Sequence, residues 1–420
     1  MCYNLVAPMI DPEQQRDFAL DVVRRLRAAG FEAYWAGGCV RDELLGRKPK
    51  DYDVATSATP PEIRALFGNP RTLPLGAAFG VITVLGPRRA GMIEVVTFRQ
   101  DAEYSDGRHP DHVTFSSARE DAARRDFTIN GMFFDPIERQ VIDFVGGQED
   151  LQNRRIRAIG PPRLRFGEDK LRMLRAVRFA AAFGFSIDAA TAAVVREMAG
   201  QITVVSPERI AMEMRRVLTE PGRLQGVRLL VDLGLAAAVL PEIVPSDETS
   251  QARVEHALGV LGRLQNPSFP LALAALLAEQ AEAATAREVG LRWKLSNKEV
   301  DEAAWLVEHR TALAGARRTR WSRLQPVLAH PWAESLVALH EASSPQGPDE
   351  AAWCRELLAQ PRASLDPPPL LTGDDLRMRG LQPGPTFKKI LQAVRDAQLD
   401  GEIRTQEEAI RLAMKLAQSV

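Results

Sequence analysis

Residues 35–42 read Trp-Ala-Gly-Gly-Cys-Val-Arg-Asp, and residues 49–55 read Pro-Lys-Asp-Tyr-Asp-Val-Ala. The pattern predicts a strand, a glycine turn into a short helix, and a second strand that carries Asp51 and Asp53. Side chains two residues apart in a strand share a face and lie about 6.5–7 Å apart, so the two carboxylates should converge. Paired carboxylates suit Mg²⁺, and glycines let backbone N–H groups approach a phosphate. This stretch therefore predicts an α/β fold that performs nucleotide chemistry.

Two further strands, at 80–85 and 92–98, are predicted by their β-branched residues and should pair beside the strand of Asp51. Glu94 is the one charged residue in the second of them. A buried carboxylate is costly unless it is paired or binds a ligand, so Glu94 is a candidate third carboxylate that holds metal or accepts a proton. The alternative is an edge-strand residue that faces water.

Composition limits the class of protein. The chain has 420 residues, a formal net charge of -1 and three cysteines. The length predicts about three domains, and the near-zero charge leaves any nucleic-acid contact to local basic patches. The cysteines form no CxxC pair, which argues against a zinc site or a disulfide framework. No apolar run is long enough for a membrane span, so we expect a cytoplasmic protein.

The sequence changes character after residue 98. The polar stretch 99–110 predicts a long loop. After about residue 150 no strand is expected, and helices of about 10–20 residues should be separated by prolines. Residues 367–369 are three prolines, which predict a stiff linker before a last helical unit.

Four motifs occur in a fixed order. They are Gly37-Gly38-x-x-Arg41-Asp42, Asp51-x-Asp53, Arg124-Arg125-Asp126-Phe127-Thr128-Ile129-Asn130, and Glu168-Asp169-x-x-Arg172-x-x-Arg175. The combination resembles the class II tRNA nucleotidyltransferases, or CCA-adding enzymes, and their relatives the bacterial poly(A) polymerases. The resemblance is dense over the first ~220 residues and loose over the last ~50.

The resemblance implies a polymerase-β-like nucleotidyltransferase head with a mixed β-sheet at 1–150, a helical neck at 151–220, a helical body at 221–365 and a helical tail at 366–420. It implies transfer of C and A from CTP and ATP to the 3′ end of tRNA, with Mg²⁺ and with no obligate protein partner or membrane. The implied catalytic residues are Asp51, Asp53 and Glu94, of which the two aspartates hold metal. The implied nucleotide-binding residues are Gly37, Gly38, Arg41, Arg125, Asp126, Asn130, Glu168, Asp169, Arg172, Arg175 and Arg178. Asp143, Gly146 and Gly147 resemble a hinge motif.

Base selection also has a basis in chemistry. On one helix, Asp169, Arg172 and Arg175 would form a polar stripe about 120° wide, since each step of three residues turns about 60°. Cytosine and adenine both present an amino donor beside a ring-nitrogen acceptor. A carboxylate can accept a hydrogen bond from the amino group, and a guanidinium can donate one to the ring nitrogen. Guanine and uracil instead present a carbonyl oxygen beside an N–H, which such a pair would not match. The alternative is an ordinary salt-bridged helix face.

Other features have weaker signals. The stretch 104–110 resembles the flexible loop of complete CCA-adding enzymes. Around His256 the chain resembles an HD-type phosphohydrolase, but Ala278-Glu279 stand where a His-Asp pair would be needed, which disfavours hydrolysis. Basic residues that could grip RNA phosphates are Arg317, Arg318, Arg320, Lys388 and Lys389.

Several functions remain open. A poly(A) polymerase would use the same chemistry on RNA 3′ ends, and a partial enzyme would add only A or only CC. A protein of another class, an RNA-binding module with a vestigial site, would not need Asp51, Asp53 and Glu94 together.

Overall fold

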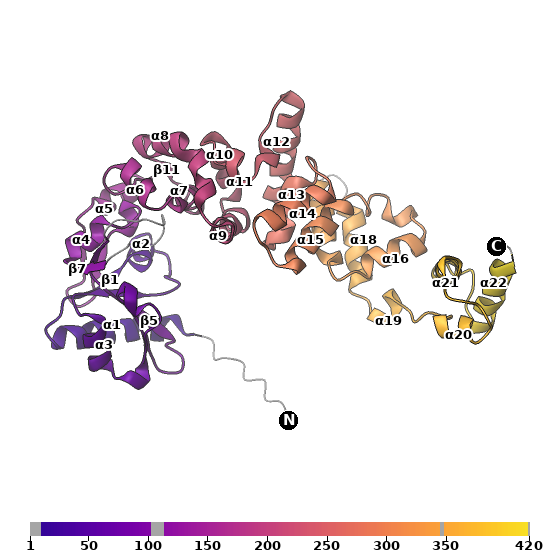
Figure 1. Ribbon diagram of the computed structural model, residues 1–420, viewed down its shortest axis with the longest axis horizontal. Coiled ribbons are helices and arrows are strands. Elements are labelled where there is room, and N and C mark those ends of the chain that lie inside the picture. The colour runs from indigo at the N-terminus through magenta and orange to yellow at the C-terminus, as the bar shows by residue number, and fades with distance from the viewer. Residues whose placement is uncertain (1–9, 102–112, 345–347, 419–420) are drawn as a thin grey trace. The chain divides into compact units, whose positions relative to one another are not determined.

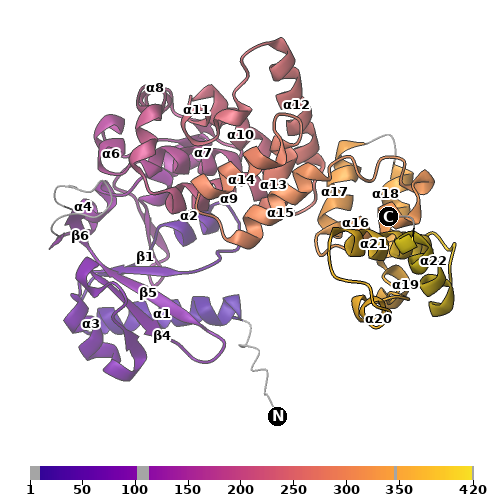
Figure 2. The same cartoon turned by 45° about the vertical axis from the view of Figure 1, so that its right-hand side comes forward.

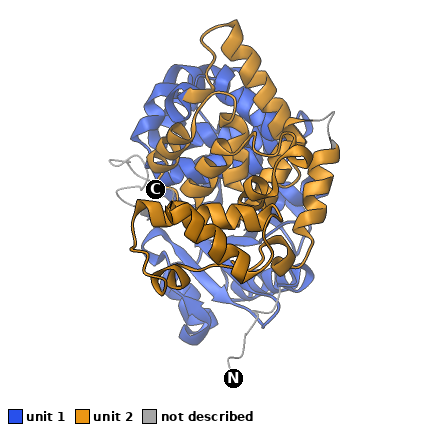
Figure 3. Ribbon diagram, turned by 90° about the vertical axis from the view of Figure 1, so that its right-hand side faces the viewer, with its two compact units in different colours: residues 1–241 blue, residues 242–420 orange. Residues whose placement is uncertain are grey.

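The computed structural model describes residues 10–101, 113–344 and 348–418, coloured along the chain in Figure 1. The chain divides into two compact units, 1–241 and 242–420 (Figure 3). The finer boundaries expected from the sequence, at 150, 220 and 365, remain predictions.

A seven-stranded sheet forms the base of the first unit, in the order β3-β4-β5-β2-β1-β8-β9. β2 and β5 pair in parallel and the other neighbours are antiparallel, so the sheet is mixed, as expected. The predicted placement of β4 and β5 beside β2 is confirmed. The strands are β1 Ala33–Ala36, β2 Asp53–Thr56, β3 Thr72–Leu73, β4 Val81–Leu85, β5 Met92–Thr97, β8 Phe133–Asp135 and β9 Gln140–Ile142.

Two helices cover one face of this sheet, α1 Pro12–Ala28 and α3 Pro60–Phe67 (Figure 2). Asp11 caps α1 by accepting from the backbone N–H groups of the first turn. Thr59 and Glu62 form a reciprocal capping box on α3. The short helix α2 Gly38–Leu44 begins directly after β1, where the glycine turn was predicted.

Two expectations about strands are wrong. β10 Arg155–Ile156 and β11 Ser186–Ile187 form a small parallel pair beyond residue 150. The expected loop 99–110 begins with β6 Arg99–Asp101, which pairs with β7 Val113–Phe115. Strands of two or three residues are too short for alternation to be visible in a sequence. The rest of that loop, including the 104–110 motif, lies outside the described residues.

Helices complete the first unit, and those that follow the sheet are magenta in Figure 1. α7 lies at their centre, in contact with α9 and α10. One face of α7 is buried, with Met173, Leu174 and Val177 fully enclosed. The helices are α4 Ala118–Ala123, α5 Gly147–Gln152, α6 Pro162–Glu168, α7 Leu171–Phe183, α8 Ala189–Met198, α9 Pro207–Thr219, α10 Arg223–Asp232 and α11 Ala236–Val239.

The described residues of the second unit form helices and no strand. α20 to α22 share a hydrophobic cluster built around Leu376, Phe387 and Ile390. No helix among the described residues is long and apolar enough to cross a membrane. The helices are α12 Glu248–Arg263, α13 Phe269–Leu277, α14 Ala283–Arg292, α15 Asn297–Glu308, α16 Trp321–Leu328, α17 Ala333–Ser343, α18 Pro348–Leu358, α19 Arg362–Leu365, α20 Gly373–Arg377, α21 Pro385–Leu399 and α22 Gln406–Gln418.

Candidate active site

A cleft of about 1080 Å³ in the first unit brings most of the predicted site residues together. Its walls come from the start of α2, the residues before β2, the segment around 124–130, and helices α7 and α9. Glu94 and Glu168 do not line it. The predicted residues that do are Gly37, Gly38, Arg41, Asp51, Asp53, Arg125, Asp126, Asn130, Asp169, Arg172, Arg175 and Arg178.

The two aspartates lie where β2 begins. The expected strand from Asp51 starts instead at Asp53, so the description of both residues as one strand face is wrong. The reason is the partner strand: β1 ends at Ala36, which pairs with Asp53, and the chain then turns at Gly37. Asp51 therefore precedes the strand, yet it lines the same cleft.

Glu94 lies next to Asp53. The two residues are register partners in the parallel pair of β2 and β5, and Glu94 is exposed. β5 lies inside the sheet between β4 and β2, so the alternative is wrong about an edge strand, although it is right that the Glu94 side chain faces water. Register partners on adjacent strands point to the same face, so Glu94 adds negative charge beside Asp53.

The electrostatics of this group suit a cation. Burial raises the pKa of Asp53 to about 7, and the charges of Asp51 and Glu94 act in the same direction, against the guanidinium of Arg125. Among the described residues no cluster of three or more His, Cys, Asp and Glu side chains is arranged to hold a metal. Two carboxylates would therefore supply part of a hard-cation shell, and phosphate and water oxygens would supply the rest.

A chain of hydrogen bonds crosses the cleft from α2 to α7. Arg41 Nη1 donates to Asn130 Oδ1 at 2.7 Å, and Asn130 Nδ2 donates to Asp126 Oδ1 at 3.2 Å. Arg175 Nε and Nη2 both donate to Asp126 Oδ2, at 2.8 and 2.6 Å. Burial opposes ionisation of Asp126, but Arg175 and Asn130 outweigh it and lower the pKa to about 2. The carboxylate is therefore held ionised and fixed.

Gly37 is required by geometry. Its φ of 73° lies in the left-handed region, and a Cβ there would sit 3.0 Å from Arg125 Nη1. That guanidinium donates to the Asn130 carbonyl at 3.3 Å and pairs with Asp121 at 2.9 Å. The turn and Arg125 thus approach each other closely because residue 37 has no side chain.

The predicted base-selecting residues do not form one helical stripe. α6 ends at Glu168, Asp169 has an extended backbone, and α7 begins at Leu171. The expectation of Asp169 on the same helix as Arg172 is wrong. Its backbone is extended, and its carboxylate accepts from the Leu171 N–H at 3.0 Å, a turn that separates the two helices. Asp169 and Arg172 nevertheless both line the cleft.

Neighbouring groups hold these side chains separately. Arg172 Nη1 bonds Glu168 Oε2 at 2.5 Å, and Arg172 Nη2 donates to the Arg124 carbonyl at 3.2 Å. Asp169 Oδ2 accepts from Arg209 Nη2 of α9 at 2.7 Å. Asp169 and Arg172 do not pair with each other, but both are salt-bridged, Asp169 to Arg209 and Arg172 to Glu168, so the salt-bridged alternative holds with other partners.

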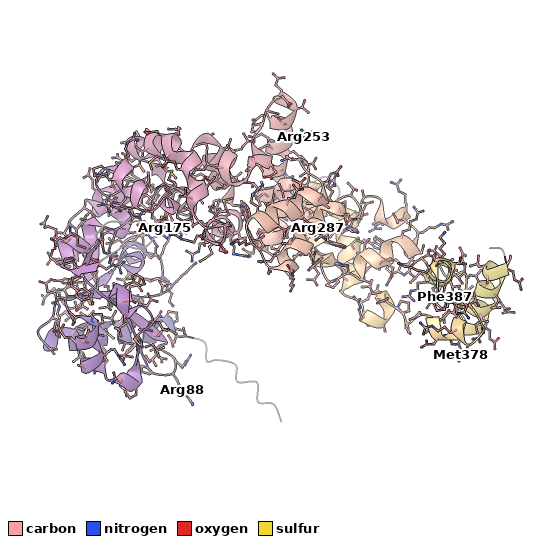
Figure 4. The ribbon with its side chains drawn as sticks, in the orientation of Figure 1. Arg88, Arg175, Arg253, Arg287, Met378 and Phe387 are labelled. Carbon is pink, nitrogen blue, oxygen red and sulfur yellow. The ribbon has the colours of Figure 1, made fainter. Side chains whose placement is uncertain are left out.

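Sequence reasoning missed several residues that line or support this wall. Glu213 of α9 accepts from Arg178 Nε at 2.6 Å and lies 3.8 Å from Arg175 Nη1. Phe179 and Phe183 lie against the arginines: Arg178 is 4.0 Å from the Phe179 ring and Arg41 is 4.5 Å from the Phe183 ring. Figure 4 labels Arg175 among the helices that contribute this wall. The sequence does contain a signal for them. Arg209 and Glu213 are four residues apart, as are Phe179 and Phe183, and residues at this spacing share one face of a helix.

The predicted residues of the second unit lie apart from this cleft's lining. His256 lies 3.7 Å from Glu279, and both side chains are about half exposed. Arg317 pairs with Asp349 at 2.9 Å, and Arg320 lies 4.0 Å from Asp400. Arg318, Lys388 and Lys389 are exposed, the lysines near the start of α21. RNA contact by these five basic residues remains a prediction.

Comparison with known proteins places these features in context. The family model described as "Poly A polymerase head domain" matches residues 33–157, and that described as "Probable RNA and SrmB- binding site of polymerase A" matches residues 184–246. The CCA-adding enzyme of Geobacillus thermodenitrificans is 34% identical over 411 residues, which cover 96% of each chain. That of Geobacillus kaustophilus is 35% identical, over 93% of this chain and 95% of its own.

Solved structures are also similar. The crystal structure of the Bacillus stearothermophilus CCA-adding enzyme in complex with CTP aligns with a TM-score of 0.78 and 29% identity, over 98% of this chain and 99% of that one. The Thermotoga maritima CCA-adding enzyme complexed with tRNA aligns with a TM-score of 0.65 and 22% identity, over 98% and 96% of the two chains. At that identity the second likeness concerns the fold alone.

Proposed function

This chain belongs to the CCA-adding enzyme family, and we propose that it adds C, C and A from CTP and ATP to the 3′ end of tRNA. The proposal rests on one observation: the same cleft is lined by the carboxylates of Asp51 and Asp53, by the glycine turn at 37–38, and by Asp169 and Arg172. In the reaction, the terminal 3′-hydroxyl of the RNA attacks the α-phosphate of the incoming nucleotide. A phosphodiester bond forms, and pyrophosphate leaves.

The nucleotide would be held at three places. Backbone N–H groups at Gly37 and Gly38, together with Arg41 and Arg125, would bind the triphosphate. The network of Asp126 and Asn130 would contact the ribose, because it lies between Arg41 and α7. Fixed positions of this kind supply much of the rate in phosphoryl transfer, since the reacting groups need no further ordering.

A divalent cation is usual for this family, and we propose Mg²⁺ held by Asp51 and Asp53, with Glu94 adding negative charge from β5. Bound there, Mg²⁺ would stabilise negative charge on the attacking and leaving oxygens. The donor set fits, because both residues offer hard oxygen atoms and the pKa of Asp53 is raised by burial as well as by the neighbouring negative charges.

We propose that Asp169 and Arg172 select the base of the incoming nucleotide. The Asp169 carboxylate would accept from the amino group of cytosine or adenine, and Arg172 would donate to the adjacent ring nitrogen. Arg209 and Glu168 position these two side chains from the protein side. Because tRNA and nucleoside triphosphates are the proposed substrates, we infer that the protein works in the cytoplasm.

The test is incorporation of each labelled nucleoside triphosphate into a tRNA transcript that ends before CCA. We expect CTP to be incorporated at once, ATP only after CTP has acted, and UTP and GTP at least ~100-fold more slowly. Asp53→Asn is the inactive control. Equal use of UTP and CTP would contradict the base-reading assignment, and absence of transfer by the wild-type protein would contradict the proposed activity.

A further inference from the structure

Asp121 of α4 is a buried carboxylate to which the proposed function gives no role. Its side chain is enclosed by the protein and does not line the cleft. Burial opposes its ionisation, but the charges of Arg125 and Arg124 outweigh that effect, so the pKa of Asp121 lies below its usual range. A charge in the interior needs partners, and the partners of this one are residues of the cleft.

The two carboxylate oxygens of Asp121 each hold one arginine. Oδ2 accepts from Arg125 Nε at 3.2 Å and from Nη2 at 2.9 Å. Oδ1 accepts from Arg124 Nε at 3.0 Å and from Nη2 at 2.6 Å. Two donors from one guanidinium fix its orientation as well as its position, which a single hydrogen bond would not do. Both arginines line the cleft, so one enclosed group orients two of its side chains.

Arg125 leads from Asp121 to the glycine turn. Its Nη1 donates to the Asn130 carbonyl at 3.3 Å, and the same nitrogen would lie 3.0 Å from a Cβ on Gly37. Arg125 is one of the groups proposed to bind the triphosphate. Its contact with a phosphate therefore depends on the direction that Asp121 gives to its guanidinium.

Arg124 leads from Asp121 to the base-selecting residues. Its carbonyl oxygen accepts from Arg172 Nη2 and from Arg165 Nη1, both at 3.2 Å. Arg165 also donates to Glu168 at 2.9 Å, and the same carboxylate bonds Arg172. The backbone of Arg124 is thus part of the support of Arg172, and Asp121 anchors that backbone through the Arg124 side chain.

A third contact fixes Asp121 to the strands of the first unit. Oδ1 also accepts from the Arg99 backbone N–H at 3.3 Å, and Arg124 Nε donates to the Arg99 carbonyl at 3.0 Å. Arg99 begins β6, two residues beyond the end of β5, which carries Glu94. The carboxylate is therefore held from the protein side and can serve as a fixed point for both arginines.

We infer that Asp121 is a positioning residue for nucleotide selection. It directs Arg125 toward the triphosphate and, through Arg124, keeps Arg172 at the base edge. This inference rests on the proposed function and adds to it a group that touches no substrate. Because both arginines share one carboxylate, a change at Asp121 should weaken phosphate binding and base discrimination together. A misplacement of about 1 Å can cost about 100-fold in rate, so a modest loosening is enough to be measured.

The experiment measures equilibrium binding of CTP and of UTP in the absence of RNA, so that no transfer can occur. UTP does not match the base-selecting pair and reports the phosphate contacts, whereas the ratio of the Kd for UTP to the Kd for CTP reports base discrimination. The test variant is Asp121→Asn, which keeps the shape but offers one acceptor oxygen in place of two. We expect UTP to bind about threefold and CTP about thirtyfold more weakly, so that the ratio falls about tenfold.

Asp135→Asn is the matched control. Asp135 is buried, pairs with Arg27 at 2.6 Å and does not line the cleft. It should lower the Tm as Asp121→Asn should, because each change deprives an arginine of its carboxylate. Both nucleotide affinities should nevertheless stay within about twofold of the wild type, because independent sites do not couple.

Arg124→Lys tests the base-selecting branch without a change to Asp121 itself. Lysine keeps the charge but lacks the planar fork that reaches both Asp121 and the Arg99 carbonyl. We expect the ratio to fall by about tenfold, while UTP binding stays within about twofold because Arg125 keeps its carboxylate. This variant tests the inference even if Asp121→Asn does not fold.

An Arg172→Ala background separates positioning from a general loosening of the cleft. If Asp121 acts on base choice through Arg172, adding Asp121→Asn to Arg172→Ala should not lower the ratio further. UTP should still bind the double variant more weakly than it binds Arg172→Ala, because Arg125 is present and has lost part of its hold.

Three outcomes would overturn the inference. An unchanged ratio in both Asp121→Asn and Arg124→Lys would mean that Arg172 keeps its place without Asp121. A further fall of the ratio in the Arg172→Ala background would indicate a general loosening. Equal effects of Asp135→Asn would assign the losses to stability alone.

The wild type supplies the reference for these titrations. If it bound CTP and UTP equally, the base-selecting assignment would be contradicted, and the inference that rests on it would be overturned as well. Binding is measured without catalysis, so a wild-type protein that discriminates between the two nucleotides but transfers neither would contradict the proposed function alone.

Discussion

Single residues of the first unit account for most of the proposed chemistry. Asp51 and Asp53 could be identified from the sequence because a glycine turn and two closely spaced carboxylates carry a chemical meaning in themselves. Glu213 and Arg209 could not be identified from the sequence, because acidic and basic residues are common on the exposed face of an amphipathic helix. Their importance comes only from the packing of α9 against α7, which places Glu213 beside Arg175 and Arg178.

Asp53→Ala should lower nucleotide transfer by about 10³-fold, since loss of a metal-binding carboxylate removes several kcal/mol of transition-state stabilisation. Affinity for tRNA should stay within a few-fold, because Asp53 is not an RNA-binding group. Single-turnover incorporation and an RNA titration measure the two quantities. Asp17→Asn, an exposed carboxylate on α1, is the matched control. Turnover that survives in Asp53→Ala would refute the metal assignment.

Arg172→Ala should lower discrimination against UTP and GTP by about 10- to 100-fold, while triphosphate affinity changes less. The reason is that the guanidinium would meet the base edge and not the phosphates. The ratio of kcat/KM for CTP and UTP measures the effect. Arg163→Ala, an exposed arginine of α6 paired with Glu197, should leave the ratio unchanged. Unaltered discrimination in Arg172→Ala would contradict the assignment of this residue to the base edge.

Asp126 predicts a specific dependence of stability on pH. Its pKa is about 2 in the folded protein and near 3.9 when unfolded, so the ionised group stabilises the fold by about 2.5 kcal/mol. Because the folded pKa is the lower one, this contribution is complete above about pH 5. It is lost progressively as the pH falls toward 2.

Hydrogen exchange of α7, corrected for intrinsic rates, can follow this contribution between pH 6 and pH 3. The opening free energy of the wild type should exceed that of Asp126→Asn most at pH 6, and the difference should shrink toward pH 3. A difference that grows on acidification would show that the ion pair of Asp126 and Arg175 is not the cause.

At the level of elements, strands with a clear hydrophobic pattern could be predicted and very short ones could not. β4 and β5 lie where expected, since each contains five or six residues that are mostly apolar and β-branched. β10 and β11 comprise two residues each, and their pairing depends on residues about thirty positions apart. The break between α6 and α7 was also missed, because an Asp can continue a helix or cap the next one.

The contact between α7 and the turn that joins α9 to α10 yields a prediction about stability. Gly222 has φ +85°, and a Cβ added to it would lie 2.0 Å from the Ala181 carbonyl oxygen, whereas Gly184 has φ +68° and open space around it. Gly184→Ala should cost about 1–2 kcal/mol for the left-handed backbone alone. Gly222→Ala adds a backbone clash, so its Tm should be clearly the lower of the two in a thermal scan. Equal Tm values would mean that α7 and the start of α10 do not approach this closely.

For the whole molecule, the sequence correctly indicated a mixed α/β part followed by helices, because strand patterns stop being visible after the first third of the chain. The boundaries within the helical part remain predictions, since similar Ala- and Leu-rich helices follow one another without a change of texture. Membership of the CCA-adding family rests on likeness over nearly the full length, and not on the head alone.

The second unit should contribute to RNA affinity and not to catalysis. Lys388→Gln with Lys389→Gln should weaken tRNA binding several-fold and reduce its salt slope by about 1–2, because the two exposed cations of α21 would no longer neutralise phosphates. The value of kcat at saturating tRNA should not change. Arg377→Gln, at a neighbouring exposed arginine paired with Asp374, is the control. A lowered kcat with unchanged affinity would contradict this division of roles.

We propose that one cleft of this protein adds a defined triplet to tRNA without a template. The most direct test of this claim uses tRNA transcripts that end before the CCA, after one C and after two, incubated with CTP, with ATP and with both, followed by sequencing of the 3′ ends. We predict completion to CCA and then a stop on all three transcripts when both nucleotides are present. Addition of A alone to the CC-ended transcript, a stop after CC, or long A tracts would contradict the claim, and would identify an A-adding enzyme, a CC-adding enzyme or a poly(A) polymerase respectively.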